Sequence, residues 1–305
     1  MHRTAATIAF PFVLAGMLGL APARLHAQPG ADHPVVVATK GGDRAEMQPM
    51  RIPSHGKLMN ALVYVAAGAG PHPAVILLHG LPGYERNLDL AQDMRRAGWD
   101  VLYFDYRGSW GTPGDFSFEH GIEDTTAALA YLRQPDVAGK LRLDPNRIVL
   151  IGHSMGGFMA VEGAAGDPAI KAFATISAVD LGGRMQSLRT TQGEHQAIAR
   201  ASEGLASAGM APLAGCSPDG LARELLQHAA DWSFQSRVGA LKNRSVLLVT
   251  SDDGFAAEDN AFAEALRKAG DTRVSTTHLS TDHVYSDQRL ELSKTVLAWL
   301  VGLPN

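Results

Sequence analysis

Ser154 is the residue whose setting best suits it for chemistry. It lies at the centre of a Gly-His-Ser-Met-Gly sequence at residues 152–156, after the apolar run 148–151 and before a stretch of small residues that can begin a helix. A serine hydroxyl is a poor nucleophile at neutral pH, so a nucleophilic serine is held on a sharp, strained turn that a base and an oxyanion hole can both reach. The flanking glycines remove side chains that would block such a turn. The pattern predicts a nucleophile elbow at Ser154.

An acid and a base for Ser154 are expected on loops at the same edge of the sheet. Asp252 and Asp253 directly follow the apolar run 246–250, and His283 lies between the next strand and the last helix. In the chain order Ser, Asp, His, the imidazole of His283 would take the serine proton while a carboxylate holds its tautomer. The short connection that follows Asp253 favours it as the acid, and Asp252 is the alternative.

The elements that must position these residues alternate along the chain. The expected strands are 47–53, 58–66, 74–78, 101–104, 148–151, 172–179, 246–250 and 274–279. Between them lie segments with helical periodicity, one of which is expected to begin at a capping Asn87 and to end at Gly98. This alternation predicts an α/β fold with a mostly parallel, eight-stranded sheet, an antiparallel edge, and helices on both faces.

The segment 180–241 interrupts this alternation. It lacks an obvious buried strand, has helix-like stretches at 196–206 and 221–230, and carries large apolar residues, namely Met185, Met210, Leu213 and Trp232. A segment this long within a compact domain is usually functional or disordered. We interpret it as a helical lid or cap with an apolar underside, the alternative being a surface excursion that never contacts substrate.

The N-terminal residues are expected to be a targeting segment. A short basic start precedes an almost wholly apolar stretch at 5–23, and the sequence Leu-His-Ala at 25–27 resembles a processing site. These features predict a cleaved secretory signal at 1–27, a single mature domain at 28–305, and a periplasmic or secreted location. An uncleaved N-terminal anchor is the alternative, and no later stretch is long and apolar enough to span a bilayer.

Composition excludes several other classes. Lys and Arg total 27 against 31 for Asp and Glu, and no basic run is present, so a nucleic acid partner is not expected. Cys216 is the only cysteine, which rules out an intrachain disulfide, and it is expected to be a half-buried small residue. Because no His-Glu-x-x-His sequence or cysteine pair occurs, neither a metal nor a cofactor is expected.

Three further residues near the predicted site have simpler interpretations. His79 ends a buried strand and is expected to hydrogen-bond nearby loop backbone, and His153 is expected to be a packed neighbour of the serine. Trp110, in a glycine-rich loop, could either line the mouth of a pocket or anchor its own loop.

Four motifs together resemble the α/β-hydrolase superfamily. They are Leu-Leu-His-Gly-Leu-Pro-Gly at 77–83, Asp-Tyr-Arg-Gly at 105–108, Gly-His-Ser-Met-Gly-Gly at 152–157 and Thr-Asp-His at 281–283. The resemblance covers about residues 47–301 and is greatest to esterase, serine-aminopeptidase-like and dienelactone-hydrolase-like members. It implies an α/β-hydrolase fold in which the backbone N–H groups of Leu81 and Met155 bind the oxyanion.

The resulting hypothesis is a serine hydrolase that forms and hydrolyses an acyl-enzyme from a small acyl substrate, most simply a carboxylic ester. A serine peptidase of the aminopeptidase type is the alternative, and it would need carboxylates such as those of Glu194, Glu203 and Glu224 to hold a free amino terminus. A non-catalytic binding module is a third hypothesis, because a fold alone does not determine function.

Overall fold

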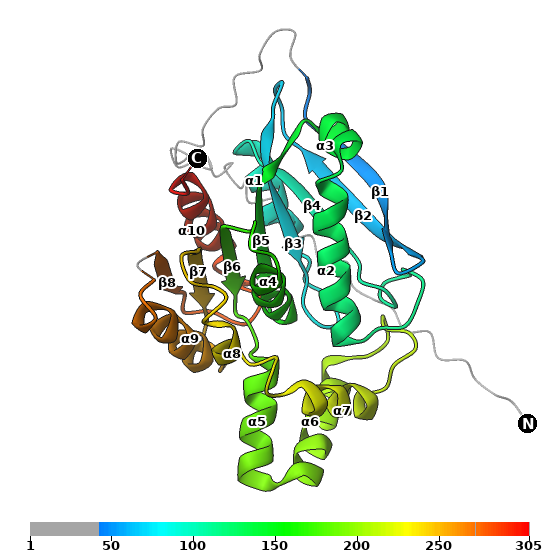
Figure 1. Cartoon of the computed structure of the whole chain (residues 1–305), viewed down its shortest axis with the longest axis vertical. Helices are drawn as coiled ribbons and strands as arrows, with labels where there is room; N and C mark the ends of the chain where they lie inside the picture. Colours follow the sequence, from blue (N-terminus) through cyan, green and yellow to red (C-terminus); the bar gives the residue numbers. More distant parts are fainter. Residues whose placement is uncertain (1–42, 272, 305) are drawn as a thin grey trace, which may run out of the picture. The chain divides into compact units, whose positions relative to one another are not determined.

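The computed structural model describes residues 43–271 and 273–304, whose strands form one eight-stranded sheet (Figure 1). The strands are β1 (Glu46–Ser54), β2 (Lys57–Val65), β3 (His72–Leu78), β4 (Asp100–Phe104), β5 (Leu143–His153), β6 (Ala172–Ile176), β7 (Ser245–Thr250) and β8 (Val274–His278). Their order across the sheet is β1-β2-β4-β3-β5-β6-β7-β8. Only β1–β2 and β2–β4 pair antiparallel, so the mostly parallel sheet with an antiparallel edge is confirmed. The signal predicted at 1–27 lies outside the described residues.

Helices connect the parallel strands. They are α1 (Leu88–Arg96), α2 (Phe118–Leu132), α3 (Pro135–Leu141), α4 (Met155–Gly166), α5 (Leu181–Gln192), α6 (Glu194–Ala208), α7 (Pro218–His228), α8 (Phe234–Arg237), α9 (Ala256–Lys268) and α10 (Arg289–Val301). No helix in the described ranges 43–271 and 273–304 is long and apolar enough to cross a membrane.

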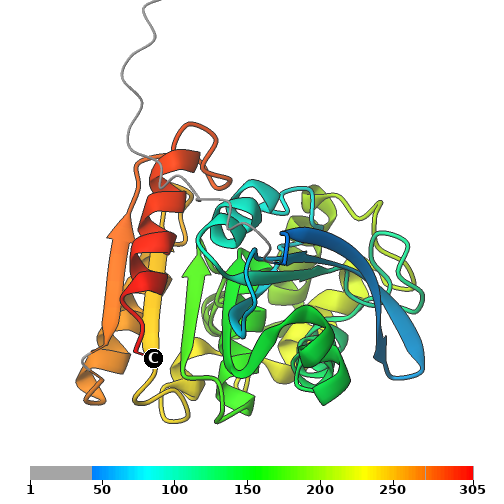
Figure 2. The same cartoon turned by 90° about the horizontal axis from the view of Figure 1, so that it is seen from above.

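The central strands are apolar on both sides because helices cover both faces of the sheet (Figure 2). Along β3, Ile76 and Leu78 belong to one core cluster, while Val75 and Leu77 belong to the other. Neighbouring side chains of a strand point to opposite faces, so the two clusters are the two faces of the sheet. Helices α1 and α10 supply the cluster that contains Val75, and α2 to α9 supply the other.

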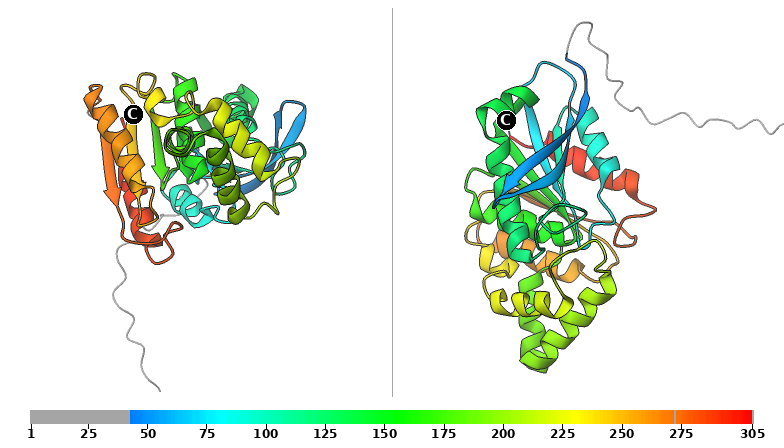
Figure 3. Two further views of the ribbon diagram at one scale, coloured as in Figure 1. Left: turned by 90° about the horizontal axis from the view of Figure 1, so that it is seen from below. Right: turned by 90° about the vertical axis from the view of Figure 1, so that its right-hand side faces the viewer.

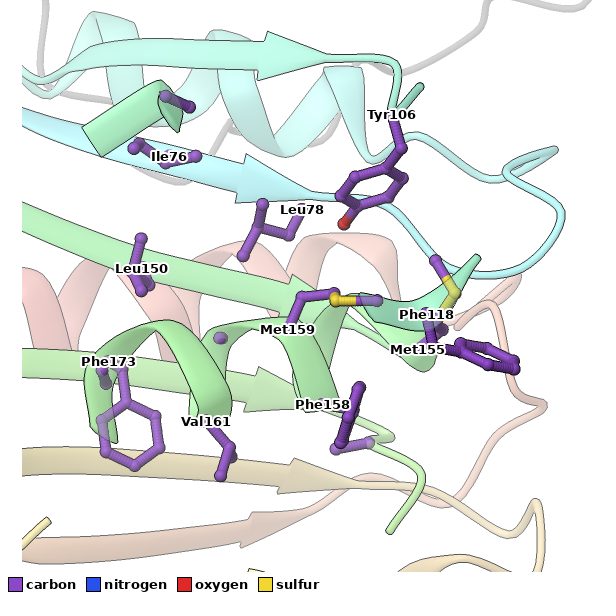
Figure 4. Packing of buried hydrophobic residues seen from close by; sticks show 14 of the residues in the cluster. Ile76, Leu78, Tyr106, Phe118, Leu150, Met155, Phe158, Met159, Val161 and Phe173 are labelled. Atoms are coloured by element: carbon purple, nitrogen blue, oxygen red, sulfur yellow. The ribbon is translucent and has the colours of Figure 1, made fainter. Parts of the chain in front are cut away.

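Helix α4 is packed tightly against the sheet directly behind Ser154. Ten of its residues are buried, among them Phe158 and Met159, which lie in one cluster with Leu78 of β3 and Leu150 of β5 (Figure 4). Burying side chains of this size typically contributes about 1.5–3 kcal/mol each. The start of α4 is therefore held firmly in place relative to the strand ends.

Two local predictions are wrong. Asn87 occupies the position before α1, but its backbone is left-handed (φ 54°, ψ 35°) and its side chain does not cap the helix. Its side-chain oxygen accepts a hydrogen bond from Arg289 at 3.0 Å instead. The strand predicted at 172–179 ends at Ile176, because Ser177 turns the chain with φ 45°.

Helices α5 to α8 make up the insert predicted at 180–241, and α5 to α7 lie beyond the carboxyl ends of the parallel strands (Figures 1 and 3). The sequence indicated α6 and α7 but not α5. The insert is tied to the loop after β4: the Phe116 N–H donates to the Ala214 carbonyl at 2.9 Å, and the Ala214 N–H donates to the Gly108 carbonyl at 2.8 Å. The Glu224 carboxylate of α7 accepts from the first backbone N–H groups of α2.

Candidate active site

Ser154 lies in a strained turn between β5 and α4, as an elbow requires. Its backbone has φ 57° and ψ −122°, outside the regions that side chains ordinarily occupy. A Cβ added at Gly152 would lie 1.8 Å from the Gly156 carbonyl oxygen, and one at Gly156 would lie 2.0 Å from the Leu78 carbonyl oxygen. Only glycine fits at either position, so this pair of residues allows the turn to form.

The structure brings Asp253, and not Asp252, to His283. The Asp253 Oδ2 atom lies 2.8 Å from His283 Nδ1, and the Asp253 side chain is only 3 % exposed. The Asp252 carboxylate points away from this pair and hydrogen-bonds Ser280 and His278 at the surface. Of the two aspartates, Asp253 is therefore the one that contacts His283.

Asp253 is held in its ionised form. Burial alone would raise its pKa, but hydrogen bonds from His283 and from the Phe255 backbone N–H favour the carboxylate. The net result is a pKa well below the usual range for aspartate. An ionised carboxylate accepts the Nδ1 proton of His283 and so leaves Nε2 of that ring free to accept another proton.

His283 is placed beside the elbow by its neighbours. Its ring centroid lies 4.8 Å from that of His153 and 5.4 Å from that of Phe255, which meets it edge-on. His153 Nε2 also hydrogen-bonds the His283 backbone carbonyl at 2.8 Å. The contacts among the described residues do not include a hydrogen bond from the Ser154 hydroxyl to His283, and such bonds are often long before substrate binds.

The residues predicted to be oxyanion donors lie close to Ser154. Leu81 and Met155 both line the cavity that Ser154 lines. The loop that carries Leu81 approaches the elbow closely, because a Cβ added at Gly80 would lie 2.9 Å from the Ser154 Cβ. Backbone N–H groups on two sides of a serine are the arrangement that stabilises a tetrahedral oxyanion.

A buried cluster of hydroxyl groups near Asp253 was not predicted. The Ser177 hydroxyl lies 2.9 Å from that of Ser251 and 2.9 Å from that of Tyr285, whose hydroxyl also donates to the Val249 carbonyl at 3.2 Å. Ser177 and Ser251 contribute to the lowered pKa of Asp253. Ser177 directly follows β6, Ser251 directly follows β7, and Tyr285 lies two positions after His283. The fold brings these three residues together, and no local sequence motif indicates it.

His79 and His153 have the structural roles expected of them. His79 is buried, with Nδ1 2.8 Å from the Gly80 carbonyl oxygen. His153 is buried beneath His283. Burial lowers the pKa of each ring to about 4, so both are neutral at pH 7.

The lowered pKa of His153 predicts a loss of stability in acid. Between pH 6.5 and pH 4 the unfolded chain binds a proton that the folded protein does not, so the free energy of unfolding falls as the pH falls through this range. Between pH 7 and pH 5 this one residue contributes a loss of about 2 kcal/mol.

Urea unfolding at the two pH values tests this prediction. The variant His153→Gln keeps a donor for the His283 carbonyl, and it should lose about 2 kcal/mol less than the wild type on acidification. His195→Gln, at an exposed position of α6, is the matched control and should behave as the wild type does. Equal losses in wild type and His153→Gln would contradict the prediction.

A cavity of about 780 Å³ opens above Ser154. Residues outside the insert, including Leu81 and Phe255, form part of its wall, and α5 and α6 of the insert form most of the rest. Of the insert's large apolar residues, Met185 lines this cavity, whereas Trp232 does not and packs edge-on against Phe158 of α4.

Trp110 anchors its own loop and is not part of the cavity wall. Its indole Nε1 donates to the Pro82 carbonyl at 2.6 Å, and the Arg86 guanidinium lies 4.4 Å from its ring centroid. Of the two interpretations of Trp110, the structure supports the anchor.

Among residues 43–271 and 273–304, no three His, Cys, Asp or Glu side chains are grouped so that they could hold a metal ion. Cys216 is partly buried, and burial raises the pKa of its thiol.

Comparison with known proteins agrees with this architecture. Residues 75–294 match the model of the alpha/beta hydrolase family. Over 108 residues the chain is 33% identical to an uncharacterized protein of Mycobacterium tuberculosis, a match covering 35% of this chain and 36% of that protein. Over 101 residues it is 36% identical to the quorum-quenching protein AidA of Acinetobacter baumannii, covering 31% and 32%. The chain thus spans about a third of the length of these curated relatives.

Solved structures share the fold at low sequence identity. A lipase in an open form gives a TM-score of 0.62 at 19% identity, over 84% of this chain and 98% of the lipase. Est1E of Butyrivibrio proteoclasticus gives 0.61 at 18% identity, over 83% and 97%. The thermostable carboxylesterase EstE1, cloned from a metagenomic library, gives 0.60 at 22% identity, over 87% and 91%. The family match at residues 75–294 covers well over half of this chain, so the chain belongs to the alpha/beta hydrolase family.

Proposed function

We propose that this protein is a serine hydrolase that cleaves carboxylic esters through an acyl-enzyme. The observation that carries the proposal is the position of Ser154: it lies on a strained elbow, faces a cavity of about 780 Å³, and has the His283–Asp253 pair beside its turn. This combination of nucleophile, base and acid is recognised by geometry and role rather than by sequence position.

In each half of the proposed reaction, His283 first takes a proton and then returns it. The Ser154 oxygen attacks the ester carbonyl carbon while His283 takes its proton, and the N–H groups of Leu81 and Met155 bind the resulting oxyanion. The tetrahedral intermediate then expels the alcohol, which takes the proton from His283. A water molecule gives a proton to His283 as it attacks the acyl carbonyl carbon. The second tetrahedral intermediate then expels the Ser154 oxygen, which takes the proton from His283, and the carboxylic acid is released.

The contacts of the insert favour an ester over a peptide with a free amino terminus. A peptidase of the aminopeptidase type needs an unengaged carboxylate near the nucleophile. Both oxygens of Glu224 accept from backbone N–H groups of α2, Glu203 pairs with Arg200, and Glu194 is exposed on the surface. The lipase, Est1E and carboxylesterase structures that share the fold are consistent with an ester substrate.

The test is labelling and turnover with the wild-type protein. A fluorophosphonate should add once per chain, and peptide mapping should locate the adduct on Ser154. A p-nitrophenyl ester should be hydrolysed, and the matching aminoacyl-anilide should be turned over far more slowly or not at all. Turnover of the anilides alone would favour the peptidase. A protein that neither reacts with the fluorophosphonate nor turns over any substrate would be a binding module of this fold.

A further inference from the structure

The cavity above Ser154 is large enough for more than the ester group itself. Its volume of about 780 Å³ lies in the upper part of the range of about 300–1,000 Å³ that is typical of small-molecule sites. An ester carbonyl at Ser154 would occupy only a small part of this space, so the cavity has room for a substituent of the substrate.

The wall formed by α5 is apolar along one side. Leu181, Met185 and Leu188 all line the cavity, and their spacing places them on one face of the helix. The four charged side chains that line the cavity are paired with one another: Arg184 with Glu258 at 2.9 Å, and Arg200 with Glu203 at 2.9 Å. Such a wall fits a hydrocarbon chain better than a charged group.

The position of the base indicates which half of the ester enters this cavity. The leaving alcohol must lie at His283, because this ring returns the proton to it. Ser154, Leu81 and Met155 line the cavity, whereas His283 is not among its lining residues. With the carbonyl oxygen between Leu81 and Met155, the cavity is left for the acyl side of the ester.

Gly204 keeps the wall formed by α6 open. It lies inside this helix and lines the cavity, although glycine is among the least favourable residues for a helix interior. A Cβ added at Gly204 would meet no atom within 4 Å, so its missing side chain leaves empty space. Any larger residue here would project into that space without displacing its neighbours.

We propose that this cavity binds the acyl chain of an apolar, medium-chain ester and that Gly204 sets the length of chain it accepts. This inference rests on the proposed function. Each methylene group that is buried on binding raises kcat/KM by about fourfold. An octanoate ester has six more methylene groups than an acetate, and burying only half of them would raise kcat/KM about 60-fold.

The test varies the two halves of the ester separately. One series of esters keeps p-nitrophenol and lengthens the acyl chain from acetate to dodecanoate, and the other keeps acetate and lengthens an alkyl alcohol. In the wild type, kcat/KM should rise steeply along the first series and little along the second. The ratio of kcat/KM for the octanoate ester to kcat/KM for the acetate ester should fall by about tenfold or more in Gly204→Leu. It should fall by a smaller factor in Gly204→Ala, and this variant keeps the result interpretable if the leucine variant folds poorly.

Gly139→Leu is the matched control, since Gly139 is an exposed helical glycine of α3 whose Cβ would also meet nothing within 4 Å. The ratio of kcat/KM for octanoate to kcat/KM for acetate should be the same in this variant as in the wild type. A preference for acetate in the wild type, or a rise along the alcohol series instead, would overturn the acyl-site inference while leaving the ester hydrolase intact. Absence of both ester turnover and fluorophosphonate labelling would remove the proposed function, and the inference with it.

Discussion

Replacing Ser154 by alanine is expected to lower kcat for ester hydrolysis by about 10⁴–10⁶-fold, with no loss of fold. The substitution removes one oxygen atom from a turn whose geometry depends on Gly152 and Gly156 and on the hydrogen bond from the Ser154 N–H to the Ile176 carbonyl. Steady-state kinetics with a p-nitrophenyl ester measures the activity, and thermal unfolding checks the fold. Labelling by a fluorophosphonate should disappear in the same variant.

Two comparisons make this result specific. Ser207 also lines the cavity, but its hydroxyl donates to the Glu203 carbonyl within α6, so Ser207→Ala should keep kcat within about threefold of the wild type. The double variant Ser154→Ala/His283→Ala should be no slower than Ser154→Ala alone, because the two residues act as a unit. Residual activity above a few per cent in Ser154→Ala would locate the nucleophile elsewhere.

The sequence predicts those site residues that directly follow strands of the parallel sheet. The apolar runs 148–151 and 246–250 located β5 and β7, and parallel strands place the residues that follow them at one edge of the sheet. This reasoning brought Ser154, the Asp252–Asp253 pair and His283 together. It could not separate the two aspartates with certainty, because neighbouring residues differ only in the direction of their side chains, and that direction depends on the turn after β7.

Other features depended on contacts between distant parts of the chain. The hydroxyl cluster joins Ser177, Ser251 and Tyr285, which are separated by up to 108 positions in the chain. Asparagine is a common helix-capping residue. The Asn87 side chain does not cap α1, because its oxygen accepts a hydrogen bond from Arg289, 202 positions later, and because the Asn87 backbone is left-handed. Helix α5 was missed because its first turn contains two glycines, Gly182 and Gly183, and because it has few apolar residues. The cavity that it helps to enclose became evident only from the arrangement of the insert.

The other large effect is expected at Asp253, where asparagine should lower kcat/KM by about 10³–10⁴-fold. Asparagine has nearly the same shape, but its amide group would donate to His283 Nδ1. The ring would then carry its proton on Nε2, the atom that must accept the proton of Ser154. The lowered pKa of Asp253 keeps the wild-type carboxylate ionised throughout the neutral range, so the loss should be as large at pH 6 as at pH 8.

Asp252→Asn is the matched control, because it makes the same chemical change one residue away. The Asp252 side chain is 56 % exposed and contacts His278 and Ser280, neither of which lines the cavity. This variant should stay within about threefold of the wild type, because the contacts of Asp252 are exposed at the surface and their loss leaves the reacting groups in place. The reverse pattern, a severe loss in Asp252→Asn with a mild one in Asp253→Asn, would mean that the acid changes partner when substrate binds. Comparable losses in the two variants would indicate that the loop itself, and not the Asp253 carboxylate, holds His283 in position.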